Sequence, residues 1–289
     1  MSSNKKIGTY QQSLLSQEEW SFSDTAQLAL KEKIEHSCKR IGEIGGINVY
    51  RGVTTGYNPA FIIDDTKRKE LAADDEKNKK LIKPMLQGRN IRKWVYNESN
   101  DYLLQTGYDL NIKKDFPLIF QRLELFKTEL VKRADRGIDW WNLRACKYYG
   151  QFEKEKIIWG LTADKWAFAY DDKKHYLPSN GYILISTVVP IKYLLAILNS
   201  KLLKYYFGFI GVMTAGGAYT LKHATIQQLP VRIAKDTEPF IALVDQILVT
   251  KTADQQADTS GLEAQIDGMV YKLYGLEPYE IDIVEGKTK

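Results

Sequence analysis

Six short apolar runs most strongly limit the folds open to this sequence of 289 residues. Each is rich in β-branched or aromatic residues, is bounded by Gly, Asn, Asp or Pro, and favours a strand over a helix. They read INVYRG, AFIIDD, DYLLQTG, KIIWGL, WAFAYDD and GYILIST, and they lie between residues 47 and 187. Because helical stretches separate them without regular alternation, the pattern argues against a doubly wound sheet and predicts a mixed α+β fold.

Apolar residues at helical spacing predict helices over residues 23–41, where Asp24 is the expected N-cap, and over 116–134 and 191–207. Two further amphipathic stretches, around 240–248 and 262–273, are separated by the polar segment 250–260. They predict an antiparallel helical hairpin near the C-terminus. The dense charged run 64–80 is typical of a solvated, mobile helix or loop.

Changes in composition divide the chain into an N-terminal helical linker (1–45), a β-rich body (46–231) and a C-terminal helical tail (232–289). Neither long apolar stretch predicts a membrane span. Residues 182–199 include Pro190 and Lys192, and residues 205–221 hold four glycines and are too short, so we predict a buried core segment there. The first 20 residues lack a signal-peptide pattern, and two cysteines cannot build a disulfide framework. We therefore expect a cytoplasmic protein.

The charge is unevenly distributed along the chain. Residues 79–230 hold 24 basic and 13 acidic side chains, whereas residues 231–289 hold 6 basic and 11 acidic ones. Tryptophans and tyrosines stand among the basic residues, as in LQGRNIRKW, VKRADRGIDWWNLR and GGAYTLKHAT. A basic body interleaved with aromatics indicates a polyanion partner, because Arg and Lys neutralise phosphates and Arg and Asn also read base edges. Trp140 and Trp141 serve equally well as core anchors for such loops.

The surrounding sequence supports none of the candidate catalytic motifs. Asn58-Pro59-Ala60-Phe61 is similar to the Asn-Pro-Pro-Tyr/Phe loop of DNA amino-methyltransferases, but only 57 residues precede it, too few for a cofactor fold. Asp65-x-Lys67 and Asp172-x-Lys174 match half of a nuclease pattern and are expected on solvated surface. The three histidines show no metal-ligand spacing. We expect no catalytic and no metal-binding residues in this chain.

Several strings occur together, in the order GINVYRGVTTGYNPAFIID, LIKPMLQGRNIRKW, YLLQTG, GIDWWNLR, KIIWGLTADKWAFAYD, YLLAILNSKLLKYYF, GGAYTLKHATIQQLPV and IDGMVYKLYGLEPYEIDIVE. Over roughly residues 45–285 this series resembles the TaqI-like C-terminal specificity domain. That domain is the target recognition part of restriction-modification methylases and fused restriction-methylation enzymes, which include phage-defence systems.

The resemblance implies a sequence-specific duplex-DNA recognition module that positions an adenine methyltransferase, with or without a nuclease, on its site. S-adenosylmethionine would belong to a methylase domain or partner and not to these residues. The predicted DNA contacts are Tyr57, Asn58, Arg89, Asn90, Arg92, Lys93, Arg133, Arg136, Trp141, Arg144, Tyr219, Thr220 and Lys222. Two alternatives stay open: a metal-dependent nuclease using Asp65 or Asp172, and a protein-interaction subunit docked through its acidic tail.

Overall fold

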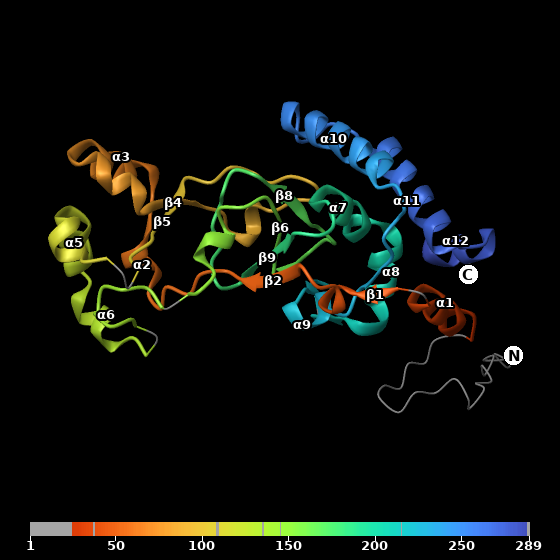
Figure 1. Ribbon diagram of the computed structural model, residues 1–289, viewed down its shortest axis with the longest axis horizontal. Helices are drawn as coiled ribbons and strands as arrows, with labels where there is room; N and C mark the ends of the chain where they lie inside the picture. Colours follow the sequence, from red (N-terminus) through yellow and green to blue (C-terminus); the bar gives the residue numbers. More distant parts are fainter. Residues whose placement is uncertain are drawn as a thin grey trace, which may run out of the picture.

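A four-stranded antiparallel sheet forms the middle of the computed structural model, which describes residues 25–36, 38–107, 110–134, 136–144, 146–214 and 216–287 (Figure 1). Its strands lie in the order β2-β9-β6-β8: β2 (Ile47–Arg51), β9 (Gly181–Ser186), β6 (Lys156–Gly160) and β8 (Ala169–Asp171). The molecule is elongated, with helices gathered at both ends of this sheet.

Both faces of the central sheet are buried, and each face belongs to a different hydrophobic core. Along β6, Ile157 and Trp159 face one core, while Ile158 faces the other, as alternation along a strand requires. Their neighbours on β9 follow the same pattern, with Leu184 in the first core and Ile183 in the second. This double burial explains why the two strands read as continuous apolar runs.

The second core fills a distal lobe at one end of the sheet. A three-stranded antiparallel sheet lies there in the order β3-β5-β4: β3 (Ile62–Ile63), β5 (Asp101–Leu104) and β4 (Ile82–Met85). Short helices surround it: α2 (Asn58–Phe61), α3 (Asp65–Asp74), α4 (Ile112–Asp115), α5 (Pro117–Glu124) and α6 (Lys127–Lys132), with 3₁₀ turns η3 (Glu76–Lys80) and η5 (Tyr149–Gln151). A further 3₁₀ turn, η4 (Gly88–Asn90), lies against β6 of the central sheet.

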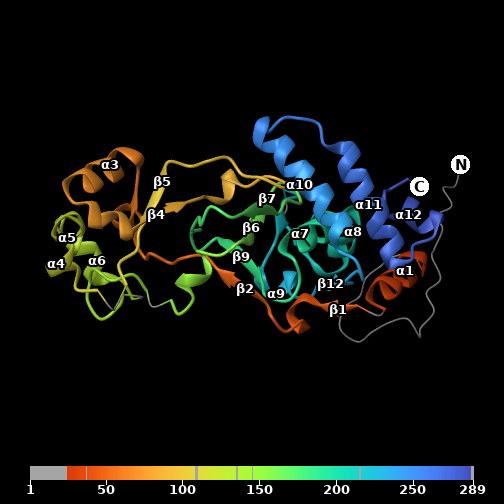
Figure 2. The same cartoon turned by 45° about the horizontal axis from the view of Figure 1, so that its top comes forward.

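The first core fills a helical lobe at the other end. Its helices are α1 (Thr25–Glu35), α7 (Ile191–Asn199), α8 (Lys201–Ile210), α9 (His223–Ile226), α10 (Glu238–Ala253), α11 (Ser260–Tyr274) and α12 (Pro278–Val284). Helices α10 and α11 run back along each other, and α10 lies against α7 (Figure 2). The predicted mixed α+β fold, with a C-terminal helical hairpin, is confirmed. α1 confirms the predicted first helix over residues 25–35, but its predicted extension to residue 41 is wrong, because residues 39–40 form a strand and Ile41 begins a 3₁₀ turn. The predicted N-cap Asp24 lies outside the described residues.

Small strands complete the helical lobe. β1 (Lys39–Arg40), followed by turn η2 (Ile41–Glu43), pairs with β12 (Pro230–Val231). Three two-residue strands form a ribbon in the order β10-β11-β7: β10 (Val212–Met213), β11 (Tyr219–Thr220) and β7 (Thr162–Ala163). The predicted domain boundaries at 45/46 and 231/232 stay a prediction.

Two helices predicted as continuous are interrupted. The stretch 191–207 breaks at Ser200, whose backbone is extended (ψ 153°) and whose hydroxyl caps α8 by accepting the Leu203 N–H. A serine hydroxyl competes with the helical backbone in this way. The stretch 116–134 breaks at Leu125 and Phe126, between α5 and α6.

Two surface expectations need correction. The charged run 64–80 forms a helix, α3, which is one of the two predicted forms, but it is not solvated throughout, because Leu71 is buried and its carbonyl accepts a 2.8 Å hydrogen bond from the buried Asn78 amide. The stretch 205–221 is not a buried core segment throughout, because β10 is exposed, with Val212 61% and Met213 53% accessible. Among the described residues, no helix has both the length and the apolarity that a membrane span needs.

Candidate nucleic-acid interface

The predicted contact residues fall into two groups. Arg89, Asn90, Arg92, Lys93, Tyr219, Thr220 and Lys222 lie around turn η4 and the small ribbon β10-β11-β7. Tyr57, Asn58, Arg133, Arg136, Trp141 and Arg144 belong to the distal lobe, in α2 and in the segment that follows α6.

The ribbon β10-β11-β7 has an inner and an outer row of side chains. Tyr219 faces inward, because its ring packs on Trp166 and Phe207 with centroids 5.8 and 6.0 Å apart. Alternation therefore directs Thr220 to the outer face. Its register partners are Val212 on β10 and Thr162 on β7, so that these three side chains form one row.

The outer row continues into a small hollow of about 220 Å³, which we call the central hollow. It is lined by Gln87, Gly88, Arg89, Gly160, Leu161, Thr162 and Asn180. Two glycines create it, because a Cβ on Gly160 would lie 3.4 Å from the Gly88 Cα. Turn η4 thus rests directly against the end of β6.

Turn η4 is held by its own neighbours in a fixed shape. The Asn90 carboxamide accepts the Gln87 N–H at 2.9 Å, and the Arg92 guanidinium donates to the carbonyls of Arg89 (2.6 Å) and Ile91 (2.9 Å). The Arg89 side chain is exposed, and within the described part of the chain its guanidinium makes no hydrogen bond or ion pair. The arrangement presents one free guanidinium on a braced turn, beside the hydroxyls and methyl groups of the outer row.

Lys93 is engaged within the protein and does not point freely to solvent. Its ammonium forms an ion pair with Glu263 on α11 and lies 5.3 Å from the centre of the Trp94 ring. Trp94 itself is buried and has a positive φ of 76°, a conformation that a bulky side chain rarely adopts. Lys93 therefore links the 88–94 segment to the C-terminal tail.

In the distal lobe, Arg133 is an internal brace. Only 8% of it is exposed, and its guanidinium donates to the carbonyls of Thr55, Trp140 and Asn142 at 2.7–2.8 Å. It also lies 4.7 Å from the centre of the Phe61 ring. These bonds fasten the segment after α6 to the loop before α2, and we leave Arg133 out of the contacts proposed below.

The other distal residues are more accessible. Arg136 and Arg144 are exposed, and Asn58 stands exposed at the start of α2, where its carboxamide accepts the Thr55 hydroxyl at 2.5 Å. Tyr57 is half-buried beside Phe126. Trp141 is half-buried in an aromatic trio with Trp140 and Phe120, at centroid distances of 5.2 and 5.3 Å, which agrees with the anchor interpretation.

Sequence reasoning missed four residues that lie near the two groups of predicted contacts. Thr162, Asn180 and Val212 reach the interface only because strand pairing brings them beside Thr220 and Arg89. Arg51 is the last residue of the edge strand β2, and its guanidinium donates to the Ser179 carbonyl at 2.5 Å. None of the four belongs to the strings LQGRNIRKW, VKRADRGIDWWNLR and GGAYTLKHAT, which carried the basic and aromatic signal, so this signal did not select them.

The charged groups buried deepest serve the fold. The Lys156 ammonium contacts the Asp171 carboxylate and donates to the Phe152 carbonyl, and His175 Nδ1 lies 2.8 Å from Asp171 Oδ1. Burial lowers the pKa of Lys156. Burial alone would raise the pKa of Asp171, but the hydrogen bond with His175 and the charge of Lys156 outweigh it and hold this pKa below its usual range. The cluster fastens the 171–175 loop to β6.

Neither nuclease candidate belongs to this buried cluster, although Asp172 directly follows Asp171 in the same loop. Asp65 pairs with Arg68 and Lys69 on its own helix, and Asp172 is an exposed loop residue. In the described ranges, no three His, Cys, Asp or Glu side chains gather as metal ligands do.

A known protein family matches the part of the chain that carries the central hollow and the ribbon. The model of the TaqI-like C-terminal specificity domain matches residues 83–231, just over half of the chain. This range contains turn η4, the central hollow and the ribbon. No curated protein matches the sequence significantly.

Three solved structures are similar to this one at low sequence identity. They are the type IIL restriction-modification enzyme MmeI in complex with DNA (11% identity, TM-score 0.58, covering 83% of this chain), the type IIG restriction endonuclease BpuSI (13%, 0.47, 87%) and the HsdS subunit from Thermoanaerobacter tengcongensis (10%, 0.39, 86%). Only the likeness to MmeI supports the fold. The chain spans 35%, 33% and 50% of these proteins, respectively.

Proposed function

This chain belongs to the TaqI-like C-terminal specificity domain family, and we propose that, as the target-recognition module of a restriction-modification system, it reads duplex DNA through the surface centred on Arg89. The proposal includes a methyltransferase domain or subunit, which would bind S-adenosylmethionine and act on an adenine that this module positions. We place the system in the cytoplasm, where phage DNA arrives.

The observation that carries the proposal is the free guanidinium of Arg89 on a braced turn next to the outer row. A guanidinium can donate two hydrogen bonds to the O6 and N7 atoms of guanine, and threonine or valine methyl groups can contact the thymine methyl. The carboxamide of Asn180, which also lines the central hollow, suits adenine. Because hydrogen bonds from Asn90 and Arg92 already fix the backbone of turn η4, little backbone order remains to be gained on binding, and the ordering cost falls on the Arg89 side chain.

Phosphate contacts would come from exposed basic residues outside the central hollow: Lys222 near the ribbon, Arg136 and Arg144 in the distal lobe, and Arg51 on β2. Such contacts supply affinity and register but carry no sequence information. Base contacts therefore account for specificity, and the two classes of residue predict different experimental signatures.

The test starts with selection from a randomised duplex library, followed by fluorescence anisotropy titrations at two salt concentrations. Enrichment of one short motif is expected. Arg89→Ala should weaken binding to the selected duplex by about 1–3 kcal/mol and relax the preference at one base position, with a much smaller effect on scrambled DNA. Lys235→Ala removes an exposed charge from the tail segment and is the matched control, for which no change is expected.

Two outcomes would contradict the proposal. The first is no binding to duplex DNA even at low salt, which would favour the protein-interaction alternative. The second is an equal loss on selected and scrambled DNA in Arg89→Ala, which would make Arg89 a phosphate contact and leave base reading elsewhere.

A further inference from the structure

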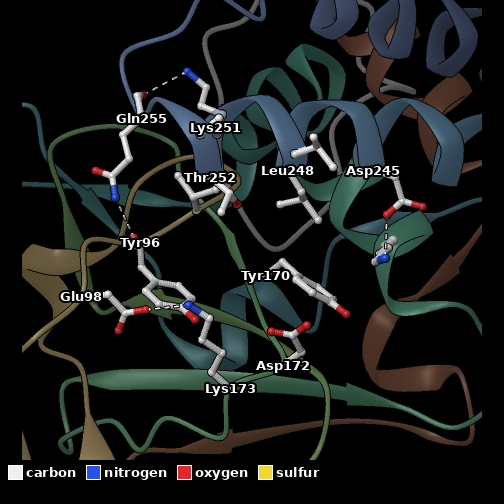
Figure 3. A pocket seen from close by; sticks show the side chains of 14 residues that line it. Tyr96, Glu98, Tyr170, Asp172, Lys173, Asp245, Leu248, Lys251, Thr252 and Gln255 are labelled. Atoms are coloured by element: carbon white, nitrogen blue, oxygen red, sulfur yellow. Dashed lines mark hydrogen bonds and ion pairs between the residues drawn. The ribbon is translucent and has the colours of Figure 1, made fainter.

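A second depression in the surface has no part in the interface described above. It is a cleft of about 710 Å³ between α10, the loop after β8 and the segment 95–98 (Figure 3). The rings of Tyr96 and Tyr170 stand in its walls, and Leu248 of α10 lies above them. Val249, which also lines it, is 72% exposed. Val249 and the neighbouring Leu248 give the α10 side of the cleft an apolar edge.

Most charged groups of the cleft already have partners. Lys173 pairs with Glu98 at 2.8 Å, and Lys192 pairs with Asp245 at 2.6 Å. Lys251 is directed to the end of α10, where its ammonium donates to the Ala257 carbonyl at 2.9 Å. The positive charges in the walls are therefore not free to bind an anion.

Asp172 is the exception. It is exposed, and no hydrogen bond or ion pair of its carboxylate occurs within the described ranges. In Figure 3 this carboxylate lies below the Tyr170 ring, on the side of the cleft that faces Tyr96. An unpaired carboxylate in a cleft that is also walled by two tyrosine rings attracts a cation, because the ring faces and the carboxylate are both negative.

The pKa values of both tyrosines reflect the negative charge of Asp172 and its neighbours. Burial raises the pKa of Tyr170, and the carboxylates of Glu155, Asp172 and Asp245 raise it further. Burial also raises the pKa of Tyr96, with further contributions from neighbouring carboxylates that include Asp172. The Tyr170 ring already has one cation near it, because the Lys192 ammonium lies 5.2 Å from its centre.

We propose that this cleft binds an arginine side chain carried by an apolar segment of a partner protein. The planar guanidinium fits between Tyr96 and Tyr170 and donates two hydrogen bonds to Asp172, whereas the flanking apolar residues cover Leu248 and Val249. DNA is not proposed as the occupant, because Lys173, Lys192 and Lys251 are engaged within the protein and offer no free ammonium to a phosphate, whereas the Asp172 carboxylate is unpaired. The site is separate from the DNA-reading surface and its existence does not depend on DNA binding.

The test uses the full chain and two synthetic peptides. One is N-acetyl-Gly-Leu-Arg-Leu-Gly-amide, and the other replaces arginine by citrulline, which has the same shape but no charge. Titration followed by calorimetry or by NMR should show at least tenfold tighter binding of the arginine peptide. Asp172→Asn should abolish this preference, and Asp164→Asn, an exposed carboxylate outside the cleft, should preserve it.

Equal binding of the two peptides, no saturable binding of either, or an unchanged preference in Asp172→Asn would each overturn the proposal. Duplex DNA affinity of Asp172→Asn is measured in parallel and should equal that of the unmodified protein. A loss of DNA binding in this variant would show that the cleft belongs to the DNA surface and would also overturn the assignment to a protein partner.

Discussion

The ion pair between Lys93 and Glu263 is expected to support DNA specificity without touching DNA. The two side chains are 33% and 23% exposed, and their charged atoms are 2.5 Å apart. Exposed pairs contribute about 0.2–1 kcal/mol, so this partly buried pair should reach about 1 kcal/mol, or roughly fivefold in a binding constant. Because Lys93 adjoins the strained, buried Trp94, loss of the pair should loosen the 88–94 segment that carries Arg89.

Four variants and two duplexes measure this effect: Lys93→Met, Glu263→Gln, the double variant and the charge exchange Lys93→Glu with Glu263→Lys. Each single variant should weaken binding to the selected duplex about fivefold and leave scrambled DNA almost unchanged. The double variant should be no worse than either single one, and the exchange should restore part of the loss.

A different pattern would refute this reasoning and support the sequence-based prediction that Lys93 contacts DNA. In that case Lys93→Met would weaken binding to both duplexes and reduce the salt slope by about one, as loss of a phosphate contact does. Glu263→Gln would then strengthen binding, because it frees the Lys93 ammonium for a phosphate.

Three further predictions concern stability. Asp171→Asn should lower the free energy of unfolding by about 3 kcal/mol in urea titrations, because it leaves Lys156 buried without its partner. Since the pKa of Asp171 is depressed in the folded protein, the stabilisation by its carboxylate is complete above about pH 4 and is lost as the pH falls further. Gly52→Ala should prevent stable folding, because the new Cβ would lie 2.0 Å from the Pro178 carbonyl oxygen, whereas Gly150→Ala, with no atom within 4 Å, should leave the melting temperature nearly unchanged. Arg133→Met should speed proteolysis of residues 134–144, because three carbonyls lose their donor; equal cleavage rates would contradict the bracing role.

Much of the fold could be read from the sequence because the strands carry strong local patterns. All six apolar runs contain strand residues, and both tail helices lie where their apolar spacing predicts them. The two helix breaks could not be predicted, because Ser200 and Leu125 interrupt stretches in which the apolar residues keep a helical spacing on both sides. A capping hydroxyl decides the first break, and its strength cannot be judged before the tertiary contacts of α7 and α8 are known.

The candidate site was only partly predictable. Basic and aromatic strings located Arg89 and Thr220, but the same signal selected Arg133, which the structure uses internally. Burial and exposure of an arginine depend on which carbonyls surround it. Residues 140 and 142 follow Arg133 closely in the sequence, but residue 55 precedes it by 78 positions, and only folding brings its carbonyl to the guanidinium. The role of Lys93 was equally hidden, because its partner Glu263 lies 170 residues away.

The pairing of β1 with β12 has a consequence for protein engineering. Lys39 and Arg40 lie opposite Val231 and Pro230, so the polypeptide enters and leaves the intervening body at neighbouring positions, about 5 Å apart in an antiparallel pair. A segment with adjacent ends can be transplanted without long connections. We expect that exchange of residues 41–229 between related chains, joined at this two-strand seam, transfers recognition as a cassette while the recipient keeps its own tail.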